Sequence, residues 1–89
     1  MATQLEEQLE ELLCDTEVCK IVVFNDNINT FPYVTACLVK YCDHSVEQAD
    51  QCTLNIHNTG KAEVKIGTYE RLKPVCDALL NRGLKAEIQ

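Results

Sequence analysis

The stretch Phe24-Asn25-Asp26-Asn27-Ile28-Asn29-Thr30-Phe31 decides how the chain is organised. It lies where a short apolar run ends and a helical pattern begins. Half of its residues are Asn or Asp, which suit turns because their side chains bond to nearby backbone and tolerate left-handed conformations. The same side chains are acceptors crowded at one point between two aromatic rings. The stretch is therefore either a capped turn between a strand and a helix, or one wall of a site for a cation with an apolar neighbour.

A strand and a helix are predicted on the two sides of this stretch. Ile21-Val22-Val23-Phe24 is a continuous apolar run, typical of a strand that is central in its sheet and covered on both faces. Thr30 is a good helix cap, and Pro32 fits the first turn, where its missing N–H costs little. The helix that follows has one apolar face, which we expect to be core, made of Phe31, Val34, Leu38 and Tyr41.

A second helix and a second strand are predicted next. The helix begins after a cap at Ser45, which forms a capping box with Gln48, and stops at Gly60. Apolar and charged residues then alternate over residues 62–66, which predicts a strand with one dry face made of Ala62, Val64 and Ile66.

A third helix and a last strand complete the chain. Thr68 is a candidate cap for this helix, but Pro74 interrupts its ladder of hydrogen bonds. Either residues 69–72 form a separate tight turn or the helix is kinked. Residues 84–88 alternate again as a half-buried strand. The order β-α-α-β-α-β predicts an α+β fold, with three helices on one face of a small three-stranded antiparallel sheet.

Residues 1–17 form an acidic amino-terminal extension to the predicted domain of residues 18–89. Its leucines recur at helical spacing among glutamates, at Leu5, Leu9, Leu12 and Leu13. Isolated helices of this length are marginal in water, so the segment either docks on the domain or folds when it meets a partner. A frayed, solvated tail is the alternative.

The chain is small and acidic. Its 89 residues make one domain with a modest core, and its net charge is -6 with a pI near 4.7. Such a charge disfavours nucleic acid and anionic membranes as partners. It favours cationic partners, among them the free amino terminus of a peptide.

Six cysteines raise the question of disulfides or a metal. They are Cys14, Cys19, Cys37, Cys42, Cys52 and Cys76. The amino-terminal residues have neither a basic nor an apolar signal region, so we expect a cytoplasmic protein whose thiols stay reduced. No spacing is Cys-x-x-Cys, and Cys42 with His44 lacks a second pair of ligands. We expect most of these cysteines to be small buried hydrophobic residues, and we expect no metal and no cofactor.

Three motifs together resemble the ClpS family, bacterial adaptors of the Clp AAA+ protease. They are Val23-Phe24-Asn25-Asp26, the helix start Phe31-Pro32-Tyr33-Val34, and Ile56-His57-Asn58-Thr59-Gly60-Lys61. The resemblance covers roughly residues 18–89, in the element order predicted above. It implies an adaptor that recognises substrates by a destabilising first residue, the N-end rule, and delivers them to an unfoldase of the ClpA or ClpC type. It also implies that residues 1–17 engage the unfoldase.

The resemblance also implies a set of binding residues. The contacts to the substrate's α-amino group fall on Asn25, Asp26, Asn27 and His57, and the gate of the hydrophobic pocket falls on Phe31, with Val34, Thr53, Ile56 and Leu84 as its wall. The chemistry agrees, because a buried ammonium has three donors and needs several converging acceptors. A bulky first side chain, Leu, Phe, Tyr or Trp, would fill the pocket. Since only neutral His57 accepts, we expect binding to weaken as the pH falls.

Two positions depart from the family's pattern. Asn27 stands where the family commonly has an acid, and losing a charge-assisted bond costs on the order of 1 kcal/mol. Phe31 stands where the family usually has Met, and a stiff ring adapts less than a thioether, so the preference for first residues is expected to change.

Two other classes of function stay open. One is an interaction module of the same fold that binds the unfoldase with weak or no recognition of amino termini, and Asn27 is the reason to consider it. The other is a cysteine-based metal or redox protein. An enzyme is the least supported class, because Cys52 and His57 do not share a helix face well and no third orienting group is evident.

Overall fold

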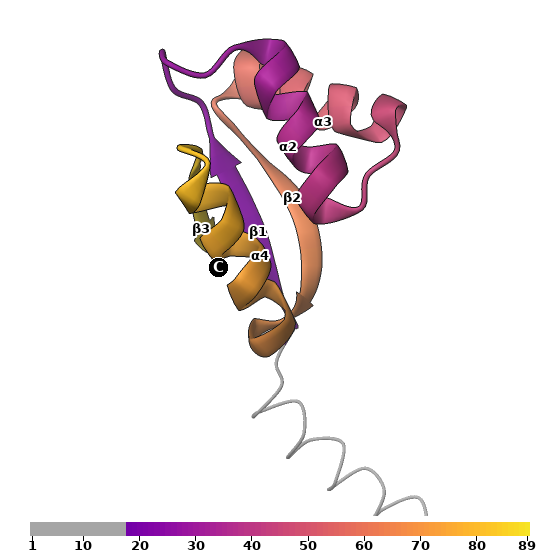
Figure 1. Cartoon of the computed structure of the whole chain (residues 1–89), viewed down its shortest axis with the longest axis vertical. Helices are drawn as coiled ribbons and strands as arrows, with labels where there is room; N and C mark the ends of the chain where they lie inside the picture. Colours follow the sequence, from indigo (N-terminus) through magenta and orange to yellow (C-terminus); the bar gives the residue numbers. More distant parts are fainter. Residues whose placement is uncertain (1–17) are drawn as a thin grey trace, which may run out of the picture.

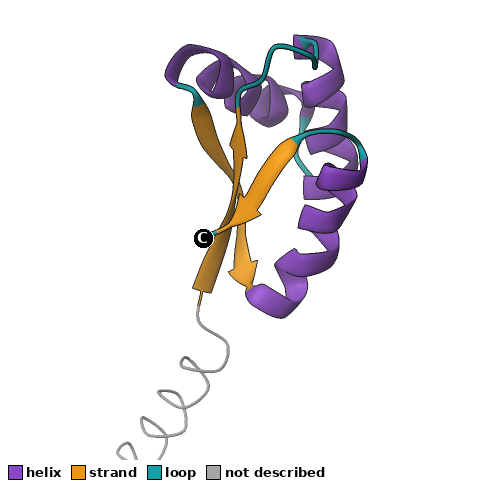
Figure 2. Ribbon diagram, turned by 90° about the vertical axis from the view of Figure 1, so that its left-hand side faces the viewer, coloured by secondary structure: helices purple, strands orange, loops and turns teal. Residues whose placement is uncertain are grey.

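The computed structural model describes residues 18–89, and within them it contains three helices and three strands. In chain order they are β1 (Val18–Phe24), α2 (Phe31–Cys42), α3 (Val46–Thr59), β2 (Lys61–Thr68), α4 (Tyr69–Asn81) and β3 (Lys85–Ile88). All three helices lie on one face of the sheet (Figures 1 and 2). The predicted α+β fold and its order of elements are confirmed.

β1 is the central strand of the sheet, as predicted. The strand order is β2-β1-β3, and both neighbours run antiparallel to β1. The apolar run Ile21, Val22 and Val23 is buried. The burial also agrees with the prediction that this strand is covered on both faces. Val22 lies on the face opposite the helices (the open face), where it stands in the register between Glu63 of β2 and Glu87 of β3, and it is only 3% exposed.

A β-bulge interrupts the pairing of β1 with β2. Ile21 pairs with Lys65 and Val22 with Glu63, so Val64 is the extra residue in β2. Paired residues share a face, so Ile66, opposite Lys20, lies on the open face. The prediction of a single dry face over residues 62–66 is therefore wrong for Ile66, which is 65% exposed, while Val64 is buried.

The carbonyl group of the bulge residue has a partner in the connection between α2 and α3. His44 is buried there, and its Nε2 donates a hydrogen bond to the carbonyl oxygen of Val64. Because a bulge leaves backbone groups outside the ladder, this bond compensates for the pairing that β2 loses at Val64.

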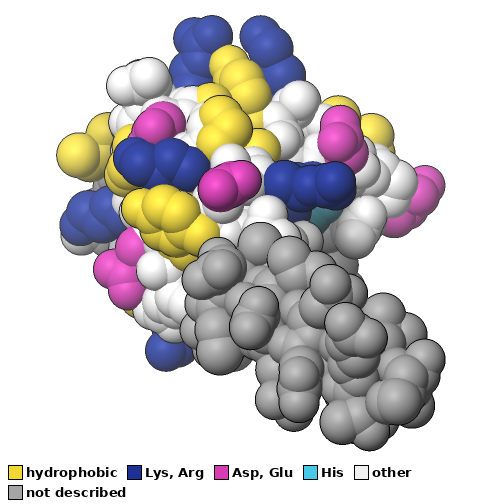
Figure 3. Space-filling view, turned by 90° about the horizontal axis from the view of Figure 1, so that it is seen from below, with side chains coloured by type: hydrophobic (Ala, Val, Ile, Leu, Met, Phe, Trp, Pro, Cys, Tyr) yellow, Lys and Arg dark blue, Asp and Glu magenta, His cyan; other side chains and the backbone are white. Residues whose placement is uncertain are grey.

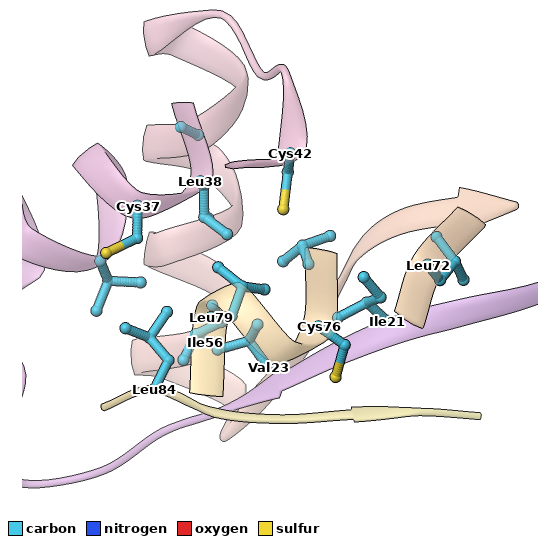
Figure 4. Packing of buried hydrophobic residues seen from close by; sticks show 13 residues of the cluster. Ile21, Val23, Cys37, Leu38, Cys42, Ile56, Leu72, Cys76, Leu79 and Leu84 are labelled. Atoms are coloured by element: carbon cyan, nitrogen blue, oxygen red, sulfur yellow. The ribbon is translucent and has the colours of Figure 1, made fainter. Parts of the chain in front are cut away.

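The core lies between the helices and the sheet. Its fully buried members include Ile21 of β1, Leu38 of α2, and Leu72 and Leu79 of α4 (Figure 4). Three cysteines, Cys37, Cys42 and Cys76, are buried in the same cluster. For these three the predicted role as small core hydrophobes is confirmed.

Each of the three helices is preceded by a residue whose hydroxyl caps it. Thr30 accepts a hydrogen bond from the backbone N–H of Tyr33, Ser45 from Gln48 and Thr68 from Arg71, as the cap predictions require.

α4 is a single helix from Tyr69 to Asn81 with Pro74 inside it, so the alternative of a separate turn at residues 69–72 is wrong. A proline at that position removes one hydrogen bond of the helix ladder.

The described domain has no net charge when its histidines are neutral. Residues 18–89 contain equal numbers of acidic and basic side chains, so the whole net charge of the chain belongs to residues 1–17. In Figure 3 basic, acidic and hydrophobic side chains alternate over one end of the domain, and neither sign of charge dominates. The predicted amino-terminal helix lies outside the described residues. Among the helices described, none is long and apolar enough to cross a membrane.

Candidate functional site

A cavity of about 400 Å³ opens between the β1–α2 loop and the two helices α2 and α3. Its lining is polar on the loop side and apolar on the helix side. The lining residues are Asn25, Asp26, Asn27, Asn29, Phe31, Val34, Thr53, Ile56 and His57. The structure thus brings eight of the nine residues that were predicted to form the site to a single cavity, and leaves out Leu84.

The β1–α2 loop is folded around the carboxylate of Asp26. Its Oδ1 accepts hydrogen bonds from the backbone N–H of Ile28 at 2.8 Å and of Asn29 at 2.7 Å. Its Oδ2 accepts from the side-chain Nδ2 of Asn29 at 2.7 Å. These bonds, chiefly the one from the backbone of Asn29, lower the pKa of Asp26. The carboxylate is therefore ionised at neutral pH, and much of its accepting capacity is used within the loop.

A backbone hydrogen bond fixes this loop against the end of α3. The N–H of Asn25 donates to the carbonyl oxygen of Gly60 at 2.8 Å. Gly60 caps α3 with a φ of 94°, a left-handed conformation that glycine adopts without strain. The bond places the exposed side chains of Asn25 and Asn27 at the cavity that His57, in the last turn of α3, also lines.

The helix side of the cavity divides into a mouth and a buried wall. Phe31, the first residue of α2, is 41% exposed, so the prediction that it belongs to the core face is wrong, and it lies where a gate is expected. Val34, Thr53 and Ile56 are buried. Leu84 is buried in the core cluster and points into the same group of side chains as Ile56 (Figure 4).

Asn29 is a cavity residue that the sequence analysis did not single out. Its side chain donates both to Asp26 and to the carbonyl oxygen of Gly83, which follows α4. The signal in the sequence was its place as the last of four Asx residues, next to the helix cap Thr30. That place indicates a turn, but a partner 54 positions away cannot be read from local sequence.

The arrangement is suited to binding a cation beside an apolar group. Amide oxygens, an imidazole and an ionised carboxylate line one side, and apolar side chains line the other. Cys52, the candidate thiol partner of His57 in a catalytic pair, is not among the lining residues, and burial raises its pKa. Within residues 18–89 no group of three His, Cys, Asp or Glu side chains gathers as a metal site would require, and no disulfide joins the cysteines described there.

Comparison with known proteins identifies the family. Residues 15–87 match the family model described as ATP-dependent Clp protease adaptor protein ClpS. A ClpS adapter protein of Thermosynechococcus vestitus is 38% identical over 66 residues, which are 73% of this chain and 70% of that protein. One from Campylobacter jejuni subsp. doylei is 30% identical in an alignment 95 positions long, which covers 100% of this chain and 97% of that protein.

A solved structure has the same fold. Agrobacterium tumefaciens ClpS2 bound to L-phenylalaninamide aligns with a TM-score of 0.65 at 19% identity, over 81% of this chain and 96% of that one. With a family model that spans most of the chain and relatives at this level of identity, the chain belongs to the ClpS family of Clp protease adaptors.

Proposed function

We propose that the protein binds the free α-amino group and the bulky hydrophobic first residue of N-degron substrates and delivers them to a Clp AAA+ unfoldase of the ClpA or ClpC type. The observation that carries this proposal is the two-sided cavity, in which acceptors of the β1–α2 loop and of α3 face an apolar wall. A peptide's first residue has two matching features on its Cα atom: an ammonium group for the acceptors and a side chain for the apolar wall.

The substrate's ammonium is held by acceptors from the two segments that the Asn25–Gly60 hydrogen bond joins, the β1–α2 loop and the end of α3. Asn25 and Asn27 each offer a side-chain oxygen, and a neutral His57 offers a ring nitrogen. Asp26 contributes its negative charge at short range, while its oxygens already accept three hydrogen bonds within the loop. The positive ligand is thereby stabilised without a second acid at position 27.

The first side chain fills the apolar part of the cavity. Val34, Thr53 and Ile56 form the buried wall, and Phe31 closes the mouth. Burying a side chain of the size of Leu or Phe contributes about 1.5–3 kcal/mol. Together with the ammonium contacts, this supports a complex in roughly the micromolar range. The ligand of Agrobacterium tumefaciens ClpS2, L-phenylalaninamide, combines an amino group with an apolar side chain in the same way.

Delivery depends on a second surface, and we assign part of it to the acidic residues 1–17. These residues hold all of the chain's net charge, so they favour a basic surface on the unfoldase. In this assignment substrate binding belongs to residues 18–89 and delivery to residues 1–17, so the two tasks fall on different parts of the sequence.

A second candidate function is that of a module that docks on the unfoldase with little recognition of amino termini. Two observations favour it: position 27 is uncharged, and the carboxylate of Asp26 is engaged by Ile28 and Asn29. The two functions differ in whether a peptide with a free amino terminus binds the isolated protein.

Fluorescence anisotropy with labelled peptides that differ only in the first residue tests the proposal. Peptides beginning with Leu, Phe, Tyr or Trp are expected to bind, and amino-acetylation is expected to abolish binding. His57→Ala should weaken binding and Asn27→Asp should strengthen it by about fivefold, the value of one charge-assisted bond. Asn58→Ala, a change at an exposed neighbour outside the cavity lining, is the control and should change nothing. Equal binding of free and acetylated peptides refutes the proposal.

A further inference from the structure

Two threonine hydroxyls form a hydrogen-bonded pair at the wall of the cavity. Thr35 of α2 donates from its Oγ1 to the Oγ1 of Thr53 in α3 at 2.9 Å. Thr53 in turn donates to the carbonyl oxygen of Ala49, one turn earlier in α3, at 2.8 Å. Both threonines are buried, and Thr53 is only 3% exposed.

The direction of these bonds defines what Thr53 can still do. A hydroxyl has one proton and two lone pairs. The proton of Thr53 is given to Ala49, and one lone pair receives the proton of Thr35. Thr53 therefore keeps one acceptor position and no donor, so a hydrogen-bonding ligand at this wall must bring a donor.

Thr53 is also the one polar residue among the buried residues that line the cavity. Asn25, Asn27, Phe31 and His57 are exposed lining residues. Among the buried lining residues, Val34 and Ile56 have apolar side chains, and Thr53 alone has a polar side-chain atom. In the complex proposed above, the first side chain lies against this buried wall.

We infer that Thr53 makes the cavity selective for a first residue whose side chain ends in a hydrogen-bond donor, with tyrosine preferred over phenylalanine. This inference rests on the proposed function. Tyrosine and phenylalanine have the same ring, and only tyrosine adds a phenolic O–H at its far end, which can donate to the remaining lone pair of Thr53. Tryptophan, whose indole N–H is a donor only, belongs to the same class.

A purely structural role for the pair makes a different prediction. The Thr35–Thr53 bond joins α2 to α3, so either threonine contributes to helix packing whether or not a ligand is present. A structural role is shared by the two residues, whereas an acceptor for the ligand belongs to Thr53 alone. Variants at the two positions therefore separate the two roles.

The test compares dissociation constants for three peptides that differ only in their first residue, Tyr, Phe or Leu, each with its acetylated form. The wild-type protein is expected to bind the Tyr peptide more tightly than the Phe peptide. In Thr53→Val, which keeps the shape and removes the acceptor, the preference for Tyr over Phe should fall by about fivefold or more, because a buried phenol is left unpaired. Thr53→Ser should restore the preference, and Thr35→Val should retain it.

Binding of the Leu peptide, which has no donor, reports whether each variant is folded and competent. If the Tyr to Phe preference is the same in wild type and Thr53→Val while Leu binding stays sensitive to acetylation, this inference is overturned and the proposed function stands. A wild-type protein that prefers Phe also overturns it. If no unacetylated peptide binds the wild-type protein, the inference and the proposed function fail together.

Discussion

The side-chain Nδ2 of Asn29 donates a hydrogen bond to the carbonyl oxygen of Gly83 at 2.9 Å, across 54 positions of the chain. Gly83 has a φ of 88° and begins the return from α4 to β3. A second bond of the same kind lies beside it, from the hydroxyl of Tyr33 to the carbonyl oxygen of Arg82 at 2.7 Å. The polar wall of the cavity is thus attached to the turn after α4.

Removing the side chain of Asn29 should loosen that wall. Asn29→Ala loses a part-buried bond to Asp26 and an exposed bond to Gly83, and we expect it to lower the free energy of unfolding by about 1–2 kcal/mol. Urea unfolding measures the change. Asn27→Ala is the matched control, since Asn27 is an exposed residue of the same loop with no hydrogen bond in the described structure, and its effect should stay within about 0.5 kcal/mol. Equal effects of the two substitutions would contradict the role of Asn29.

The stability that Asp26 provides should depend on pH. Because the folded protein lowers the pKa of this carboxylate, its contribution is present above the unfolded value of about 3.9 and is lost as the pH falls through the lower folded value. Asp26→Asn should therefore be less stable than wild type at pH 7, on the order of 1 kcal/mol or less given the exposure of the group. The difference should shrink as the pH falls below the unfolded value of about 3.9 toward the lower folded value. Chemical unfolding at pH 7, 5 and 3 measures it, and a difference that grows in acid would be against this account.

Truncating the gate should affect binding more than stability. Phe31→Ala removes a half-exposed ring from the mouth, so the loss of affinity for a Phe peptide should be about fivefold, and the cost in stability less than about 1 kcal/mol. Tyr69→Ala is a matched control, because Tyr69 is likewise an exposed aromatic residue at the first position of its helix and lies outside the cavity lining. Comparable losses of affinity in both variants would argue against a gate at Phe31.

The buried thiols should react slowly. Burial raises the pKa of Cys42 to about 11 and also raises the pKa of Cys76, so the reactive thiolate is scarce at pH 8. Alkylation followed by mass spectrometry should show both residues protected in the native protein and modified rapidly in urea. Rapid native modification of Cys42 would mean that the core opens far more often than its packing indicates.

Local sequence signals were enough to predict the elements and their order. Thr30, Ser45 and Thr68 each start a helix, and the apolar run before Asn25 is the central strand. These features depend on contacts within a few residues, which is why periodicity and caps reveal them.

Features that depend on distant contacts could not be predicted in this way. The bulge at Val64 turns Ile66 to the open face, and its partner His44 comes from another part of the chain. Asn29 likewise finds Gly83 only in the folded domain. The assignment of Leu84 to the pocket wall stays a prediction, because the structure places this residue in the core beside the site and not among the lining residues.

The balance of charge in residues 18–89 has a consequence for how the protein meets its partners. A folded domain with no net charge exerts little electrostatic force on a distant partner. At physiological ionic strength the electrostatic potential of any charge is screened over about 8 Å. Encounter rates with a basic surface should therefore respond to ionic strength through residues 1–17 alone, whereas the rate at which a peptide leaves the cavity should not. The rate of encounter with a basic partner can then be changed through the acidic residues 1–17, and the rate at which a peptide dissociates can be changed separately through the cavity.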